Sequence, residues 1–261
     1  MVKLRGKILK SRLKKTVGLI LSLAVIISSI IILKNTGAYS VYTLATKNRD
    51  LPIYGVERED GALSISFDCA WGTEYTQKIL DTLEFYKVKC TFFMTEFFVE
   101  KYPDFVKKIS DAGHEIGTHS KTHSYMSKMS EKAIREELIS SKTAIEKITG
   151  KKVELFRPPY GDYDDLLVGV AREEGLYTIQ WNVDSLDWKN LSAERIATRI
   201  LKQAKSGSII LCHNNGLHTA ESLPLIFSAL QEKGLVFRPI GELIYKNGYK
   251  ILPNGTQIKN D

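Results

Sequence analysis

GALSISFDC, residues 61–69, is the stretch that decides the fold of this 261-residue chain. Its leucine, isoleucine and phenylalanine alternate with two serines, which is the period-two pattern of a β-strand. A carboxylate, Asp68, follows the last of these apolar residues, and residues 75–86 then carry a helical pattern. This order of strand, polar strand end and helix recurs along the rest of the chain.

Alternating strands and helices make up most of the sequence after residue 61. Strands are predicted at 89–93, 115–118, 153–156, 177–182, 208–211 and 236–239, and helices at 103–112, 130–149, 164–174, from 192 onward and at 223–233. Such alternation gives parallel strands joined by right-handed crossovers. About seven units in roughly 185 residues favour a closed fold over an open sheet. We therefore predict an α/β protein, a distorted (β/α) barrel preceded by an N-terminal membrane helix.

The net charge of +7 is confined to the N-terminus. The first fifteen residues carry seven lysines and arginines and no acid, so residues 16–261 hold 30 basic and 30 acidic residues and are formally neutral. A domain that binds nucleic acid needs a basic surface to meet the phosphates. No nucleic acid is therefore expected as a partner.

Residues 17–33, VGLILSLAVIISSIIIL, form an uncharged run that predicts a membrane helix. The basic cluster before it is expected to stay in the cytoplasm, which places the rest of the chain outside. We expect a single-pass protein of the cell membrane with an extracytoplasmic domain, or a secreted protein if the run is a cleaved signal. The predicted divisions are a basic cytoplasmic segment (1–16), the anchor or signal (17–33), a connector (34–60), the catalytic domain (61–247) and a C-terminal tail (248–261).

His119 and His123 lie four residues apart, so both imidazoles fall on one face of a helical turn and can reach one divalent metal. This spacing is weak by itself. Other polar residues follow predicted strands in the same way: Asp68, Arg157, Asp184 and His213. Because the carboxyl ends of barrel strands line the active site, these residues are expected to share one site.

Asp68 is the candidate general base, since a carboxylate at a strand end can take a proton from water. Arg157 opens the turn Arg-Pro-Pro-Tyr-Gly, whose prolines fix the backbone. We expect Arg157 to pair with Asp68 and hold it ionised, and Tyr160 to present its backbone N–H to an oxyanion.

His213 follows a buried-strand run and needs an acidic partner to act as a catalyst. Asp187, in Asp-Ser-Leu-Asp-Trp (184–188), is the candidate. Such a pair keeps the histidine protonated and able to donate to a leaving amine. A metal, a base, an acid and an oxyanion donor together predict metal-assisted hydrolysis of an amide or ester.

Five ordered motifs closely resemble those of the polysaccharide deacetylases of the NodB-homology family, which are carbohydrate esterases. They are Ser-Phe-Asp (66–68), His-Ser-Lys-Thr-His (119–123), Arg-Pro-Pro-Tyr-Gly (157–161), Asp-Ser-Leu-Asp-Trp (184–188) and Leu-Cys-His (211–213). The resemblance covers roughly residues 61–243. It implies a distorted barrel, a bound divalent metal, most often zinc, and removal of N-acetyl groups from chitin-like sugars or peptidoglycan.

The resemblance also implies a role for each matching residue. Asp68 is the expected base, His119 and His123 the metal ligands, Arg157 the partner of Asp68, His213 the acid, Asp187 its tuning partner, and Trp188 and Leu211 the walls of the acetyl pocket. The stretch FDCAWG (67–72), together with the membrane anchor, is most similar to the sporulation-type branch that acts on the cell wall or spore cortex.

Cys69 departs from the family pattern, which has a second aspartate as the third metal ligand at this position. Three readings stay open. Cys69 binds the metal as a thiolate, which zinc accepts well; or two histidines and water hold the metal weakly; or no metal binds and the protein recognises glycan without cleaving it. The predicted function is N-deacetylation of peptidoglycan amino sugars, with a glycan-binding pseudoenzyme as the alternative.

Overall fold

The computed structural model describes residues 50–260, which belong to the compact unit that begins at Asp50. The strands of its main sheet are β2 (Ala62–Cys69), β3 (Thr91–Met94), β4 (Glu115–Thr118), β5 (Leu155–Phe156), β6 (Tyr177–Thr178), β7 (Val183–Asp184), β8 (Ile209–His213) and β9 (Val236–Phe237). The α-helices are α3 (Thr76–Phe85), α4 (Glu96–Lys101), α5 (Pro103–Asp111), α6 (Glu131–Thr149), α7 (Asp165–Glu173), α8 (Ala193–Gln203), α9 (Thr219–Glu232) and α10 (Ile240–Leu243). Three 3₁₀ turns join them: η1 (Met126–Lys128), η2 (Pro159–Gly161) and η3 (Asp187–Lys189).

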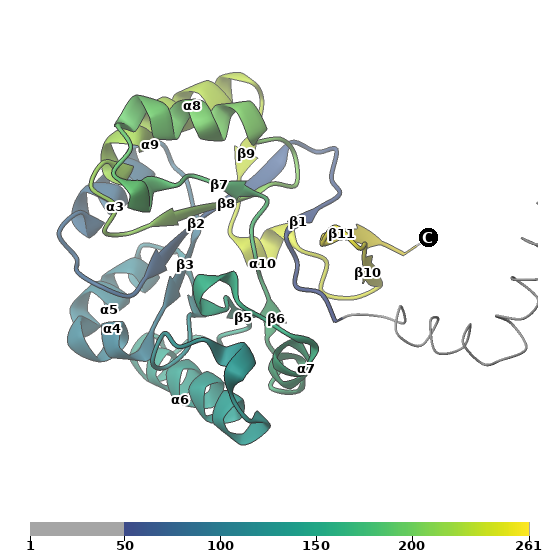
Figure 1. Ribbon diagram of the computed structural model, residues 1–261. Helices are drawn as coiled ribbons and strands as arrows, with labels where there is room; N and C mark the ends of the chain where they lie inside the picture. The colour runs from purple at the N-terminus through teal and green to yellow at the C-terminus, as the bar shows by residue number, and fades with distance from the viewer. Residues whose placement is uncertain (1–49, 261) are drawn as a thin grey trace, which may run out of the picture. The chain divides into compact units, whose positions relative to one another are not determined.

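Seven strands follow one another through the sheet in the order β6-β5-β4-β3-β2-β8-β7, and every neighbouring pair is parallel. The sheet curls into a half-barrel, with α8 and α9 packed together at one end and α6 and α7 at the other (Figure 1). The predicted α/β class and strand-helix order are confirmed. The hydrogen-bonded path ends at β6 and β7, so the predicted barrel is not closed by a β6–β7 ladder within residues 50–260.

Strand β2 is the centre of the sheet, and all eight of its residues are buried. A strand covered on both faces must bury its serines as well as its apolar residues, and the Ser66 hydroxyl donates to the carbonyl of Ile210. The register places Asp68 beside His213 of β8. Two of the predicted catalytic residues, 145 positions apart in sequence, thus meet because β2 and β8 pair.

The predicted helix ends match the structure where capping residues are strong. The Ser130 side chain accepts from the N–H of Ala133 at the start of α6, and Gly150 ends that helix with a left-handed φ of 66°. Ser192 caps α8 in the same way. The short helix α4 was not predicted, and α9 begins four residues earlier than expected, with Pro224 inside it.

Residues on both sides of the predicted domain 61–247 belong to the same compact unit. Gly55–Val56 (β1) pairs with Thr256–Lys259 (β11), which also pairs with Tyr249–Ile251 (β10). The end of the predicted connector and the predicted tail therefore form one three-stranded sheet. The predicted anchor, 17–33, lies outside the described residues. Among residues 50–260, no helix has the length and apolar character needed to cross a membrane.

Candidate active site

A cleft of about 570 Å³ opens at the carboxyl ends of the parallel strands. Eight of the eleven predicted site residues line it: Asp68, His119, His123, Tyr160, Asp184, Trp188, Leu211 and His213. Two more, Arg157 and Asp187, lie behind this wall and bind residues that line it. The structure therefore brings ten of the eleven predicted residues to one place, and Cys69 is the exception.

Asp68 and Arg157 form a buried ion pair at the bottom of the cleft. Arg157 is fully buried, and its Nη1 lies 2.8 Å from Oδ1 of Asp68. The guanidinium also donates to the carbonyl of Gln180 and stacks 4.2 Å above the ring of Phe93. Burial alone would raise the pKa of Asp68, but the charges of Arg157, His119 and His213 outweigh it and lower that pKa. Asp68 is thus a carboxylate at neutral pH and can accept a proton.

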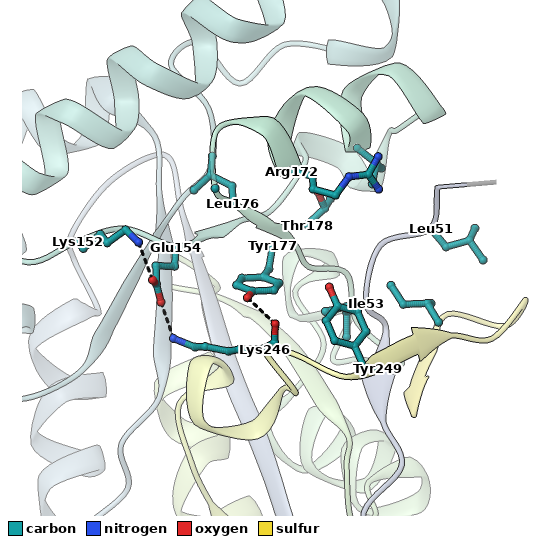
Figure 2. Close-up of a pocket in the computed structure, with 13 residues that line it drawn as sticks. Leu51, Ile53, Lys152, Glu154, Arg172, Leu176, Tyr177, Thr178, Lys246 and Tyr249 are labelled. Atoms are coloured by element: carbon teal, nitrogen blue, oxygen red, sulfur yellow. Dashed lines mark hydrogen bonds and ion pairs between the residues drawn. The ribbon is translucent and has the colours of Figure 1, made fainter. Parts of the chain in front are cut away.

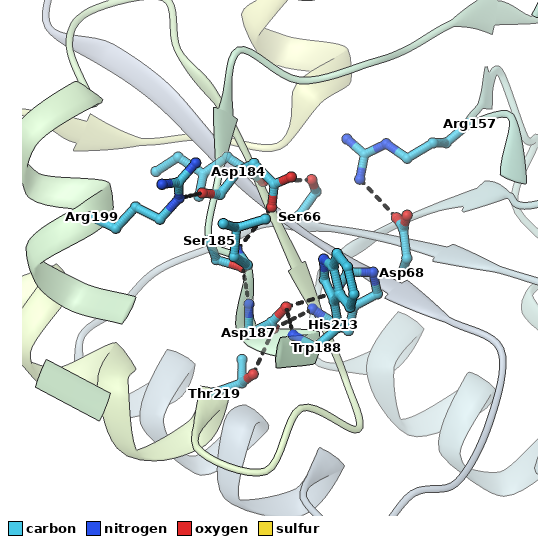
Figure 3. Close-up of polar contacts among 12 residues, drawn as sticks. Ser66, Asp68, Arg157, Asp184, Ser185, Asp187, Trp188, Arg199, His213 and Thr219 are labelled. Atoms are coloured by element: carbon cyan, nitrogen blue, oxygen red, sulfur yellow. Dashed lines mark hydrogen bonds and ion pairs between the residues drawn. The ribbon is translucent and has the colours of Figure 1, made fainter. Parts of the chain in front are cut away.

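His213 and Asp187 form a second hydrogen-bonded pair on the other side of the cleft (Figure 3). His213 Nδ1 lies 2.7 Å from Asp187 Oδ1, and the backbone N–H of His213 donates to Oδ2 of the same carboxylate at 2.7 Å. Burial lowers the pKa of His213, but the hydrogen bond and charge of Asp187 outweigh it and raise that pKa. The imidazolium form therefore persists to a higher pH than in an ordinary histidine.

The carboxylate of Asp187 is held by other groups that the sequence did not reveal. The hydroxyl of Thr219 donates to Oδ2 at 2.6 Å, and the N–H of Trp188 donates to Oδ1 at 2.9 Å. Burial favours the neutral acid, yet the hydrogen bonds and charge of His213, together with the hydrogen bond from Thr219, lower the pKa of Asp187. Thr219 could not be recognised from sequence, because it starts a helix and belongs to none of the motifs.

Two further tryptophans, Trp71 and Trp181, also line the cleft. Trp71 is 56% exposed and its ring lies 4.9 Å from that of His123, while Trp181 follows β6. Neither tryptophan was assigned a role in the site from the sequence. Trp71 could have been predicted to line the cleft, because it follows the carboxyl end of the strand that carries Asp68.

Tyr160 lies in the rigid proline turn and adopts a left-handed φ of 60°. This conformation is uncommon for a residue with a side chain and is found where the surroundings impose it. The Tyr160 ring lies 4.6 Å from the ring of His123. The turn thus fixes Tyr160 at the cleft, while the use of its N–H as an oxyanion donor stays a prediction.

His119 and His123 present two neutral imidazoles to the cleft. Nδ1 of His119 lies 2.8 Å from the carbonyl oxygen of Arg157, which can only accept, so Nε2 holds the lone pair. Burial lowers the pKa of both rings, that of His123 to about 4. Nδ1 of His123 is buried and has no hydrogen-bond partner among the described residues. These are the properties of two metal ligands.

The third ligand of the expected metal site is missing from the cleft. The side chain of Cys69 is fully buried in the hydrophobic core, with its Sγ 3.7 Å from the carbonyl of Phe67. Burial and the charge of Asp68 raise the pKa of this thiol well above its usual value, which disfavours the thiolate. Within residues 50–260, no three His, Cys, Asp or Glu side chains are grouped so as to hold a metal. The residues do not fit the Cys-His-His site that was the first reading.

A different hollow, of about 390 Å³, lies near the amino ends of β5 and β6 (Figure 2). Its charged residues are all in ion pairs: Lys152 and Lys246 contact Glu154, and Arg172 contacts Asp50. The Tyr177 hydroxyl donates to the carbonyl of Lys246. Barrel enzymes place their chemistry at the opposite end of the strands, so this hollow is not the active site.

Comparison with known proteins agrees with the geometry of the cleft. Residues 55–179 match the family model described as polysaccharide deacetylase. A peptidoglycan-N-acetylglucosamine deacetylase of Bacillus cereus is 36% identical over 198 residues, which cover 74% of this chain and 92% of that protein. The uncharacterized protein YlxY of Bacillus subtilis is 34% identical, and the match spans only 60% of its length.

The similar solved structures include deacetylases and one protein described as a pseudoenzyme. BA3943 of Bacillus anthracis, a CE4 family pseudoenzyme, superposes with a TM-score of 0.72 at 35% identity, over 74% of this chain and 68% of its own. A mutant of that pseudoenzyme is described as having restored enzymatic activity. On sequence, fold and cleft together, this chain belongs to the polysaccharide deacetylase family, NodB-homology or CE4.

Proposed function

We propose that this domain removes acetyl groups from the N-acetylated amino sugars of peptidoglycan by hydrolysis, releasing acetate. The observation that carries the proposal is the pairing of Asp68 with Arg157 and of His213 with Asp187 across one cleft. One pair holds a carboxylate ionised and the other holds an imidazole protonated. Amide hydrolysis needs this combination of base and acid.

The chemistry follows from these protonation states. Asp68 takes a proton from water, whose oxygen attacks the acetamide carbonyl carbon. The backbone N–H of Tyr160 donates to the oxyanion that forms. His213 then gives its proton to the sugar nitrogen as the C–N bond breaks, so that acetate and the free amine leave. Trp188 and Leu211 line the cleft and form the walls against which the acetyl methyl packs.

The proposal includes a metal site with two protein ligands in place of the expected three. We propose that His119 and His123 together with water hold a divalent ion, zinc being the expected metal, and that Cys69 takes no part. Catalytic zinc sites usually have three protein ligands, so two imidazoles should bind the ion more weakly. A bound ion would polarise the carbonyl and the attacking water.

The location and branch are also proposed. The uncharged run 17–33 after a basic cluster supports a membrane anchor with the domain outside the cytoplasm, and a cleaved signal with secretion is the alternative. A wall polysaccharide would then be within reach. The FDCAWG stretch supports the sporulation-type branch.

A second function is favoured by one observation, the burial of Cys69 away from the cleft. A domain without the third metal ligand can bind glycan and fail to cleave it. Three of the structures similar to this chain are of a pseudoenzyme and its mutants. This reading keeps the cleft and its aromatic walls but assigns no turnover to the base and acid.

Acetate release separates the two functions. The purified chain, dialysed and then loaded with zinc, cobalt or manganese, is incubated with peptidoglycan and with chitooligosaccharides, and the Bacillus cereus deacetylase serves as the working control. Release that disappears in Asp68→Asn supports the hydrolase. Saccharide binding without release, equal in wild type and Asp68→Asn, supports the pseudoenzyme.

A further inference from the structure

Another hollow, distinct from the one near β5 and β6, lies next to the catalytic cleft, between η3 and the exposed face of α8. It measures about 620 Å³. Four cations line it, Lys189, Arg195, Arg199 and Lys202, against the single carboxylate of Glu194. We call this hollow the basic groove. It carries an excess of three positive charges in a region of sequence, 16–261, that is formally neutral.

The four cations of the basic groove have no acidic partner in the part of the chain that the structure describes. Elsewhere on the domain surface Arg135 binds three carboxylates and Arg172 binds Asp50. Within residues 50–260, no ion pair within 4.0 Å involves Lys189, Arg195, Arg199 or Lys202, although Glu194 lines the same groove. Such a groove offers its charge to a ligand.

Arg199 is the most fixed of the four. It is half-buried, and its Nε donates to the carbonyl of Asp184 at 2.6 Å (Figure 3). That bond sets the plane of the guanidinium, and neither of its two terminal nitrogens has a hydrogen-bond acceptor among residues 50–260. A fixed guanidinium is suited to the two oxygens of a carboxylate.

One 3₁₀ turn separates the basic groove from the catalytic cleft. In η3, Asp187 binds the catalytic His213, Trp188 lines the cleft, and Lys189 lines the groove. The ammonium of Lys189 lies 4.9 Å from the centre of the Trp188 ring. A polymer with one sugar in the cleft that passes over Trp188 therefore reaches the groove with its neighbouring part.

We propose that the basic groove binds the carboxylates of the peptide stem carried by a sugar next to the one in the cleft. This inference rests on the proposed peptidoglycan substrate. While the lactyl groups are joined to the stems as amides, the glycan backbone presents neutral amides and hydroxyls, whereas the peptide stems carry the carboxylates. Charge complementarity then assigns the glycan to the aromatic cleft and the stem to the cations.

The test is equilibrium binding of the full-length chain to two tetrasaccharides of peptidoglycan. One carries its peptide stems; from the other an amidase has removed them, and the lactyl carboxylates that this hydrolysis leaves on the sugars have been converted to neutral amides. The variant is Arg195→Gln with Lys202→Gln, which leaves η3 and Arg199 intact. The matched control is Lys132→Gln with Lys147→Gln, two exposed cations of α6 at the other end of the sheet (Figure 1).

Wild type and control should bind the stem-bearing ligand about fivefold more tightly than the stem-free one, since each exposed ion pair changes affinity only a few fold. The groove variant should lose that preference and keep its affinity for the stem-free ligand. The preference should also shrink at 0.5 M salt. Equal binding of both ligands by wild type, or equal weakening of both in the variant, overturns the proposal that the basic groove binds the stem. Failure of wild type to bind either ligand refutes the proposed substrate instead. Tight binding to anionic lipid vesicles or teichoic acid in place of the stem also overturns it.

Discussion

Replacement of Cys69 by serine tests whether its thiolate is a ligand of the metal. A thiolate ligand would be lost in Cys69→Ser, because a serine hydroxyl is a far weaker ligand for zinc. The Sγ atom, however, lies in the core and not in the cleft. We therefore expect zinc bound per chain, measured by atomic emission after dialysis at several zinc concentrations, to be the same in wild type and Cys69→Ser.

The same substitution should lower stability by a small amount. Placing a hydroxyl in apolar surroundings costs about 1–3 kcal/mol in proteins. The carbonyl of Phe67, 3.7 Å from Sγ, offers an acceptor, so the cost should be about 1 kcal/mol, at the lower end of that range. For a domain of roughly 200 residues this lowers the melting temperature by about 2–4 °C. Urea unfolding and thermal unfolding measure it.

Cys90→Ser is the matched control, since Cys90 is also fully buried and was never a candidate ligand. It should show a similar loss of stability and unchanged zinc. His123→Ala is the positive control and should lower zinc affinity at least tenfold, because it removes one of two imidazoles. If Cys69→Ser loses zinc while Cys90→Ser retains it, the side chain of Cys69 reaches the metal in solution and the reasoning is refuted.

Three further substitutions test the cleft. In Asp68→Asn, acetate release should fall about 10²–10⁴-fold while saccharide binding persists, because the base is removed; release at the wild-type rate contradicts its role. Asp187→Asn removes the main group that raises the pKa of His213, so the fall of kcat/KM on the alkaline side should move to lower pH, and an unchanged pH profile would show that Asp187 does not tune the acid. Trp188→Ala should raise KM for peptidoglycan about tenfold with a smaller change in kcat; the reverse pattern in steady-state kinetics would place Trp188 in the chemical step.

Asp68 and His213 also make the free energy of unfolding of the domain depend on pH. Asp68 has a lowered pKa when folded, so its contribution is complete above its unfolded pKa and is lost as pH falls toward the folded value. His213 has a raised pKa, so its contribution is complete below its unfolded pKa and is lost as pH rises through the folded value. Both contributions are greatest at weakly acidic pH.

The order of strands and helices was predictable because it depends on local sequence features, namely hydrophobic periodicity and capping residues. Residues 115–118 form the predicted strand, and Ser130 and Gly150 begin and end α6 as capping rules require. The closure of the sheet was not predictable in this way. Strands β6 and β7 have two residues each, so whether they pair depends on twist and not on a sequence pattern.

Of the site residues that the sequence did predict, only Cys69 lies away from the cleft, and strand geometry explains why. Asp68 and Cys69 are consecutive in β2, and successive side chains of a strand point to opposite faces. If Asp68 faces the cleft, Cys69 must face the core unless the strand ends between them. The resemblance suggested a ligand at this position, whereas strand alternation, applied to the same two residues, predicts the burial that the structure shows.

The buried pair of Asp68 and Arg157 bears on the choice between enzyme and pseudoenzyme. Taking both charges out of water costs several kcal/mol per ion, and well-packed apolar residues would often stabilise a core as well or better. Glycan recognition relies on the exposed aromatic walls, which do not need a fully buried guanidinium. A carboxylate with a lowered pKa that opens onto a cleft, opposite an imidazole with a raised pKa, is the arrangement that proton transfer requires. The cost of this pair is therefore best explained by hydrolysis, and at the proposed site of two histidines a metal would assist it only weakly.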